Sequence, residues 1–241
     1  MKAQGGRVSL RKGDIRKKEI LKTAEMMFCR NGYEKTSIQD IIDVLHSSKG
    51  SFYHHFVSKE ALLEGICRKR ADQNYELTVK AMDGISDPVQ CLDHLISGMI
   101  PFHDEKLSFL MMLLPLFRSH DGKTVRNYYS EALSEQFRDS VREQIEKASE
   151  KEKLFCTDPE YTADIILSIV NRLWISICDK IITAEDQGKE TDLYELLRLT
   201  DSCRTAISRI LSLPYGVIRI TDITIMRDLC KQIHQHWPTE Q

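Results

Sequence analysis

Residues 36–60 read TSIQDIIDVLHSSKGSFYHHFVSKE, and this stretch decides the fold. Thr36 and Gln39 have the spacing of a capping box, in which a hydroxyl and an amide side chain satisfy free backbone donors where a helix begins. Apolar residues then recur at the spacing of one helix face, which predicts a short amphipathic helix over a small core. The residues of this face are Ile38, Ile41, Ile42 and Leu45.

The next residues, His46, Ser47 and Ser48, predict a tight turn. Serine side chains hydrogen-bond to nearby backbone and interrupt a helix, and histidine accepts the left-handed conformation more readily than most residues. A second short helix should follow, with Phe52 and Phe56 on the face that packs against the first helix. Two short helices joined in this way form a helix-turn-helix.

The outer face of the second helix has small and polar residues. Gly50 lies on this face, although a glycine inside a helix costs about 1 kcal/mol relative to alanine. A close approach to the floor of a DNA major groove explains the small side chains, because bulky ones would hold the backbone away from the base edges. Lys49, Tyr53 and Lys59 flank this face and are placed to reach phosphates.

Residues 48–63, SKGSFYHHFVSKEALL, closely resemble the recognition helix and following helix start of the TetR family of bacterial transcriptional regulators. The resemblance extends from about Ile15 to Leu63, although the turn has His46 and Ser47 where the family usually has glycine and a small apolar residue. The resemblance implies a homodimer that represses transcription until a small molecule binds its C-terminal domain. A symmetric dimer reads a palindromic operator in double-stranded DNA.

The resemblance also implies which residues contact DNA. Thr36 and Ser37, together with Tyr53 and Lys59, match family positions that contact phosphates. The remaining predicted contacts, to bases and the adjacent backbone, are Lys49, Gly50, Ser51, His54 and His55, with Ser47 and Ser48 of the turn.

Charge is distributed unevenly along the chain, whose formal net charge is -2. Residues 1–60 hold 12 Lys and Arg against 7 Asp and Glu, so the basic part is local to the predicted DNA-binding end. Residues 1–14 form a basic, glycine-containing arm. This arm is either a solvated flexible tail or a segment that follows phosphates or enters the minor groove.

The chain is predicted to be all-α, with a three-helix DNA-binding domain at residues 15–58 and a helical ligand-binding and dimerisation domain at residues 59–241. Asn31-Gly32 predicts a left-handed end to the first helix, and Ser58 predicts the N-cap of a helix that ends near Ala81. The other predicted helices lie at 89–100, 107–117, 125–150, 159–182, 192–211 and 221–237.

The helices predicted at 159–182 and 192–211 have apolar stripes suited to packing against other helices. Packing within the chain explains these stripes. The resemblance implies a second explanation, in which both helices pair with their copies in another subunit. The predicted interface residues are Ile165, Ile169, Trp174, Leu196, Thr200, Cys203 and Ile207.

Aromatic and methionine side chains in the C-terminal part are typical of a core and also of a ligand pocket. Core filling is the commoner role, and only the resemblance predicts a cavity here, for a small apolar or aromatic effector. Buried polar groups such as Asn171 would need a partner, either a ligand or a neighbouring side chain. The predicted ligand-binding residues are Phe102, Phe109, Met112, Phe117, Tyr128 and Trp174.

Seven scattered cysteines indicate reduced thiols in the cytoplasm. Cys91, His94 and His103 have an irregular ligand spacing, and we predict no metal site and no cofactor. The longest apolar run, 107–117, is too short to cross a bilayer.

The sequence has no phosphate loop, nucleophile elbow or zinc-hydrolase motif, so no enzyme activity is predicted. Two alternatives to a ligand-responsive repressor remain. One is the same fold as an activator, or as a regulator controlled by a protein partner without a small-molecule pocket. The other is a helical ligand-carrying or enzymatic protein.

Overall fold

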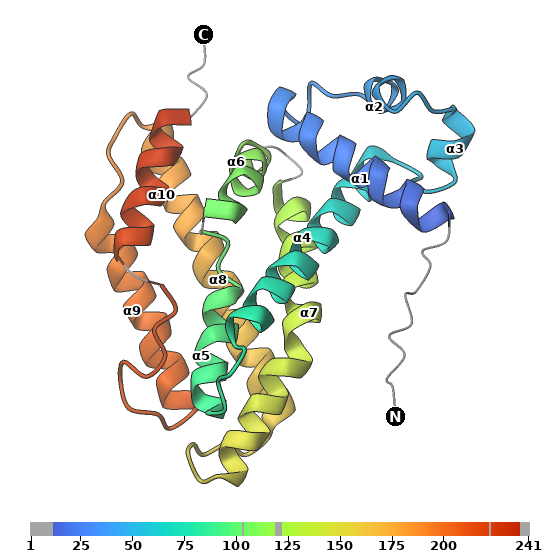
Figure 1. The fold of residues 1–241 in the computed structure, drawn as a ribbon. Coiled ribbons are helices and arrows are strands. Elements are labelled where there is room, and N and C mark those ends of the chain that lie inside the picture. Colours follow the sequence, from blue (N-terminus) through green and yellow to red (C-terminus); the bar gives the residue numbers. More distant parts are fainter. Residues whose placement is uncertain (1–11, 103, 119–121, 222, 237–241) are drawn as a thin grey trace, which may run out of the picture. The chain divides into compact units, whose positions relative to one another are not determined.

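All the regular secondary structure of the described residues is helical, as the sequence predicts (Figure 1). The computed structural model describes residues 12–102, 104–118, 122–221 and 223–236. The chain divides into two compact units, Met1–Ile66 and Cys67–Gln241. This division falls inside α4, Lys59–Ala81. Most of the basic arm predicted at residues 1–14 lies outside the described residues.

The first unit is built from α1, Lys12–Asn31, α2, Ile38–Val44, α3, Lys49–Tyr53, and the start of α4. α1 ends at Gly32, whose φ of 87° and hydrogen bond to the Phe28 carbonyl oxygen at 3.0 Å confirm the predicted left-handed end. The hydroxyl of Ser58 accepts the N–H of Ala61 at 3.1 Å, which confirms the predicted N-cap of α4. The fully buried core side chains include Ile20, Ala24, Phe28, Ile41, Phe52 and Leu62.

The second unit holds the remainder of α4 and the helices from α5 to α10. Three of these helices begin where the side chains of Asp87, Asp158 and Asp192 accept backbone N–H groups. Proline follows two of the three aspartates, at a position where a helix needs no backbone donor. The observed ranges are α5, Pro88–Gly98; α6, Asp104–Arg118; α7, Gly122–Glu150; α8, Pro159–Asp186; α9, Leu193–Ile210; and α10, Ile223–His236.

α8 is the central helix of the second unit, with contacts to α6, α7, α9 and α10. The indole N–H of Trp174 donates to Asn171 Oδ1 at 3.0 Å, in the interior of the unit. Asn171 Nδ2 donates to the Ser130 carbonyl oxygen at 3.1 Å and to Ser134 Oγ at 2.8 Å. Neighbouring groups of α7 therefore satisfy Asn171, which is the commoner of the two roles expected for it.

α4 and α5 cross closely at Gly98. A Cβ atom at this position would lie 2.1 Å from Thr78 Oγ1 and 2.6 Å from Thr78 Cγ2, so the crossing has no room for a side chain. The Thr78 hydroxyl donates to the Asn74 carbonyl oxygen at 2.8 Å, and Asn74 Nδ2 donates to the Gly98 carbonyl oxygen at 3.2 Å. The crossing therefore fixes the side-chain orientation of Asn74.

Candidate functional site

The turn between α2 and α3 is closed by a Schellman motif. His46 has a φ of 47°, and its N–H donates to the Asp43 carbonyl oxygen at 3.1 Å. The N–H of Ser47 donates to the Ile42 carbonyl oxygen, also at 3.1 Å. These two bonds satisfy carbonyl groups that the end of a helix leaves free. The predicted turn is confirmed, with histidine in the conformation that glycine adopts most easily.

α2 begins one residue later than predicted. Ser37 is its N-cap, because the Ser37 hydroxyl accepts the N–H of Asp40 at 3.1 Å and the Asp40 carboxylate accepts the N–H of Ser37 at 2.8 Å. The predicted Thr36–Gln39 box is therefore wrong. Thr36 is buried, and its hydroxyl donates to the Gly32 carbonyl oxygen at 2.8 Å. The hydrogen bonds from the side chain and backbone of Ser37 hold the pKa of Asp40 below its usual value.

The other residues predicted to contact phosphates differ in how exposed they are and in the contacts that they already make. Ser37 is exposed at the N-cap, and Tyr53 is 48% exposed on α3. The Lys59 ammonium lies 4.1 Å from the centre of the Tyr33 ring and 3.5 Å from the Glu34 carbonyl oxygen, to which it donates. Cation–π attraction therefore already holds the Lys59 side chain against the Tyr33 ring.

The outer face of α3 has little side-chain bulk. Lys49, Gly50 and His54 are exposed, whereas Phe52 on the inner face is fully buried. A Cβ atom at Gly50 would meet no atom within 4 Å, and the backbone of Gly50 is not left-handed. Neither packing nor backbone conformation in this chain requires a glycine here. A surface that closely approaches α3 from outside is the remaining physical reason.

The turn and α3 bring the predicted base-reading residues together. The Ser48 hydroxyl accepts the N–H of Ser51 at 3.1 Å and so caps α3. The rings of His54 and His55 pack edge to face, with centres 5.0 Å apart. Ser47, Ser51 and His55 are half-buried beside the exposed residues of this face.

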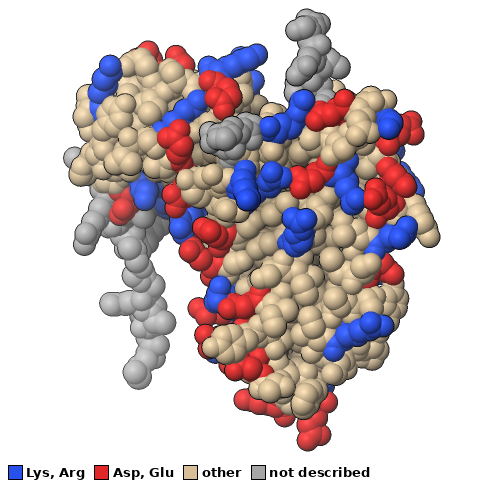
Figure 2. Space-filling model, turned by 180° about the vertical axis from the view of Figure 1, so that it is seen from behind, with Lys and Arg blue, Asp and Glu red and all other residues tan. Residues whose placement is uncertain are grey.

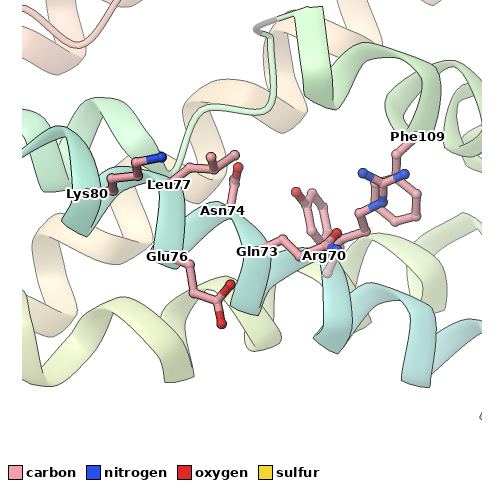
Figure 3. Close-up of a pocket in the computed structure, with 8 residues that line it drawn as sticks. Arg70, Gln73, Asn74, Glu76, Leu77, Lys80 and Phe109 are labelled. Carbon is pink, nitrogen blue, oxygen red and sulfur yellow. The ribbon is translucent and has the colours of Figure 1, made fainter. Parts of the chain in front are cut away.

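A pocket of about 390 Å³ lies between α4, α6 and α7 in the second unit (Figure 3). α6 contributes Phe109 and α7 contributes Tyr129, whereas α4 provides the rest of the lining. The guanidinium of Arg70 lies over the Phe109 ring, with its central carbon 5.4 Å from the ring centre. The lining residues of α4 are Arg70, Gln73, Asn74, Glu76, Leu77 and Lys80.

Two lining residues of this pocket are polar and buried. Asn74 is 2% exposed and Tyr129 is 1% exposed. Burial raises the pKa of the Tyr129 phenol, so the hydroxyl stays protonated and is able to donate a hydrogen bond. The Tyr129 ring packs edge to face on Phe109 and on Trp174, and Trp174 in turn contacts Phe117. A row of aromatic rings therefore extends from the pocket into the core.

The predicted ligand-binding residues are divided between the pocket and the core. Phe109 lines the pocket, and Tyr128 is half-buried on α7. The other four are buried in the second unit away from the pocket wall, where they fill the core: Phe102, Met112, Phe117 and Trp174.

The prediction missed the α4 wall of the pocket, including Arg70 and Asn74. Polar residues on a long helix usually face solvent, so composition does not indicate that Asn74 is buried. A signal was nevertheless present, because positions 70, 73, 74 and 77 follow the spacing of one helix face.

α8 and α9 form an exposed groove of about 690 Å³. Its lining includes Ile165, Ile169 and Cys203, three of the predicted interface residues, and Ile165 is 51% exposed. The view in Figure 2 shows broad uncharged areas between charged side chains on one face of the protein. The other four predicted interface residues are buried within the chain and offer no surface to a second subunit: Trp174, Leu196, Thr200 and Ile207.

Among the described residues, no group of three or more His, Cys, Asp and Glu side chains is placed to hold a metal ion. The Cys91 thiol is buried and donates to the Ile85 carbonyl oxygen at 3.6 Å, and His103 lies outside the described residues. In the described part of the chain, no helix has both the length and the apolar composition needed to cross a membrane.

Residues 20–66 match the family model for bacterial regulatory proteins of the tetR family. The chain is 30% identical over 121 residues to the HTH-type transcriptional regulator YerO of Bacillus subtilis, across 47% of this chain and 40% of YerO. It is 34% identical over 80 residues to the HTH-type transcriptional repressor KstR2 of Mycolicibacterium smegmatis, across 33% of this chain and 39% of KstR2. The chain therefore spans about 40% of the length of these curated relatives.

A solved structure extends the shared fold beyond residues 20–66. The TetR-family transcriptional regulator ECA1819 of Pectobacterium atrosepticum matches with a TM-score of 0.61 and 18% identity, over 86% of this chain and 100% of that chain. In sequence, the HTH-type transcriptional regulator UidR of Escherichia coli K12 is 23% identical over 186 residues, across 74% of this chain and 87% of UidR.

Proposed function

This chain belongs to the TetR family of bacterial regulatory proteins, and from this membership we propose that it is a transcriptional repressor that binds a palindromic operator as a homodimer. A small molecule that fills the pocket between α4, α6 and α7 releases the protein from DNA. The similarity to KstR2, a transcriptional repressor, supports repression over activation. We also infer that the protein acts in the cytoplasm and has no catalytic activity.

The proposal rests mainly on the outer face of α3. Gly50 has open space around it and an ordinary backbone, so its missing side chain benefits a partner and not the fold. In the major groove, this face would bring Ser51 and His54 to base edges. Lys49, Tyr53 and the exposed Ser37 hydroxyl would contact phosphates and fix the register.

The groove of α8 and α9 supports a dimer. Ile165 and Ile169 give it an apolar floor that a second copy of the same two helices would cover. Two α3 helices related by a two-fold axis then meet two half-sites, with centres about one helical turn, roughly 34 Å, or a multiple of it apart.

The pocket supports a small molecule over a protein partner as the effector, because a fully packed second unit would leave no such space. α4 supplies Leu62, Leu63 and Ile66 to the core of the first unit and also supplies the pocket wall from Arg70 to Lys80. A ligand that favours one arrangement of α4 therefore acts on the helix that enters the DNA-binding unit. A coupling of about 1 to 3 kcal/mol changes operator affinity by about 5- to 150-fold.

Selection of bound fragments from random double-stranded DNA by the purified full chain tests the proposal. The expected product is a palindrome with two equal half-sites. Tyr53→Phe should weaken binding to all sequences and reduce its salt dependence, whereas His54→Ala should change the preferred base. Recovery of no enriched sequence, or an unchanged base profile in His54→Ala, would contradict the proposed α3 contacts.

A further inference from the structure

The Phe56 ring, just after α3, is held between two other helices of the first unit. It is 5% exposed, and a Cβ atom at Gly65 of α4 would lie 3.0 Å from Phe56 Cε1 and 3.0 Å from Leu21 Cδ2 of α1. The ring and the Leu21 side chain therefore fill the space that this glycine leaves. Phe56 also packs near Phe52 of α3, with ring centres 6.3 Å apart. A close-packed ring of this kind gives a defined position to any group that lies over it.

Lys17 of α1 lies over this ring. Its ammonium is 5.9 Å from the centre of the Phe56 ring, within the range of cation–π attraction. Lys17 is exposed and forms no ion pair with any residue that the structure describes. The adjacent cation differs, because Arg16 pairs with Glu19 at 2.8 Å. The charge of Lys17 therefore remains available to a partner from outside the chain.

The same end of α1 lies beside the outer face of α3. A Cβ atom at Gly13, one turn before Lys17, would lie 3.9 Å from His55 Cε1. The start of α1 therefore packs beside the residues that end α3, as Figure 1 also shows. Tyr53 and His54, which precede His55, are exposed and belong to the face proposed to enter the major groove. The Lys17 ammonium is thus next to the surface that DNA would contact.

We propose that Lys17 binds a phosphate of the operator backbone beside the C-terminal end of α3. Lys49 begins α3, so the two cations lie near opposite ends of this helix and together fix its register in the groove. The contact with Phe56 restricts the Lys17 side chain before DNA binds, which reduces the entropy lost on binding. This inference rests on the proposed function, because it adds a residue to the same DNA-binding surface.

Titration of the selected operator with the full chain at several salt concentrations tests the role of Lys17. Lys17→Met keeps the apolar stem and removes the charge. Because a dimer loses two phosphate contacts, the slope of log affinity against log salt concentration should become shallower by about 1.8, or about 0.9 for each contact. Affinity at 0.1 M salt should fall at least about tenfold, with the preferred bases unchanged.

Three further variants separate the charge from the fold. Lys17→Arg keeps the charge and should keep the slope, whereas Lys17→Gln should give the same slope as Lys17→Met. Lys22→Met is the matched control, since Lys22 is also an exposed lysine of α1 but lies five residues further, on a different side of the helix. Its slope should differ from that of the wild type by less than about 0.5. Thermal melts of all four variants check that the fold is kept.

Three results would overturn the inference: an unchanged slope in Lys17→Met, an equal change in Lys22→Met, or an altered base preference in Lys17→Met. If the wild type selects a palindrome and the slope of Lys17→Met is unchanged, only Lys17 is removed from the DNA-binding surface. If the wild type selects no sequence, the proposed function fails. Random duplex DNA then tests Lys17 separately, because a phosphate contact lowers the salt dependence on any sequence.

Discussion

Gly50 and His46 lie close together in the sequence, and at each position another residue would suit the stability of the fold better. His46 occupies a left-handed position, at a φ of 47°, where glycine would be the least strained choice. Gly50 occupies a helical position with open space, where alanine would be the better choice for stability. The fold would be more stable with glycine at position 46 and with alanine at position 50. The requirement for a glycine at position 50 therefore comes from outside the chain.

Gly50→Ala should separate stability from DNA binding. The added methyl group meets no atom within 4 Å, so the free energy of unfolding should rise by up to about 1 kcal/mol. Operator affinity should fall, because the methyl group moves α3 away from the base edges. Denaturant unfolding and DNA titration of the same sample measure the two effects. A variant that is more stable and binds DNA as well as the wild type would remove α3 from the proposed interface.

The His46 position should respond to backbone preference. His46→Gly should keep or raise the free energy of unfolding, whereas His46→Val should lower it by about 1–2 kcal/mol, because a β-branched residue is strained at a positive φ. Thermal melts of both variants give the comparison. Equal melting temperatures would show that the turn does not depend on this conformation.

At the scale of helices, the sequence predicts the start of a helix well where only one residue is suited to be its N-cap. The helices predicted to begin at residues 89, 159 and 192 begin within one residue of these positions, and their N-caps are Asp87, Asp158 and Asp192. The start of α2 was ambiguous, because Thr36 and Gln39 have the same spacing as Ser37 and Asp40, and only the burial of Thr36 decides between the pairs. The spacing of positions 70, 73, 74 and 77 places these α4 residues on one helix face, but their burial depends on α6 and α7, which are distant in sequence, so the sequence alone does not show that this face lines a pocket.

The crossing of α4 and α5 should not accept a methyl group. Gly98→Ala would place Cβ 2.1 Å from Thr78 Oγ1, and overpacking of this kind costs about 1–3 kcal/mol. Thermal unfolding should show a lower melting temperature for Gly98→Ala than for Ser97→Ala, the control one position earlier on α5. Thr78→Ala in the Gly98→Ala background should recover part of the loss, because it removes the clashing atoms. No recovery would mean that another contact excludes the methyl group.

At the scale of the whole protein, charge and apolar surface are separated along the sequence. Residues 1–60 hold an excess of Lys and Arg, whereas the remainder has more Asp and Glu, which agrees with the DNA-binding role proposed for the N-terminal end. The exposed apolar groove of α8 and α9 belongs to the acidic remainder. The two surfaces therefore suit the two different partners that we propose, operator DNA and a second subunit.

Ile165→Glu should separate the subunits of the proposed dimer. A two-fold interface contains the substitution twice, so the dissociation constant of the dimer should rise by at least about a hundredfold. Analytical ultracentrifugation measures this constant, and affinity for the palindrome should fall in parallel. Phe155→Glu is a matched control, because Phe155 is 69% exposed and is not part of the groove lining. Equal sedimentation of the two variants would place the interface elsewhere.

The row of rings that leads inward from Phe109 has a spectroscopic consequence. Trp174 is fully buried, and its ring centre lies 5.7 Å from that of Tyr129, which lines the pocket. Replacing Trp237 with Phe leaves Trp174 as the only indole fluorophore of the chain. Occupation of the pocket should then change the intensity or wavelength of the Trp174 emission. The intrinsic fluorescence of the protein would therefore report ligand binding without an attached dye.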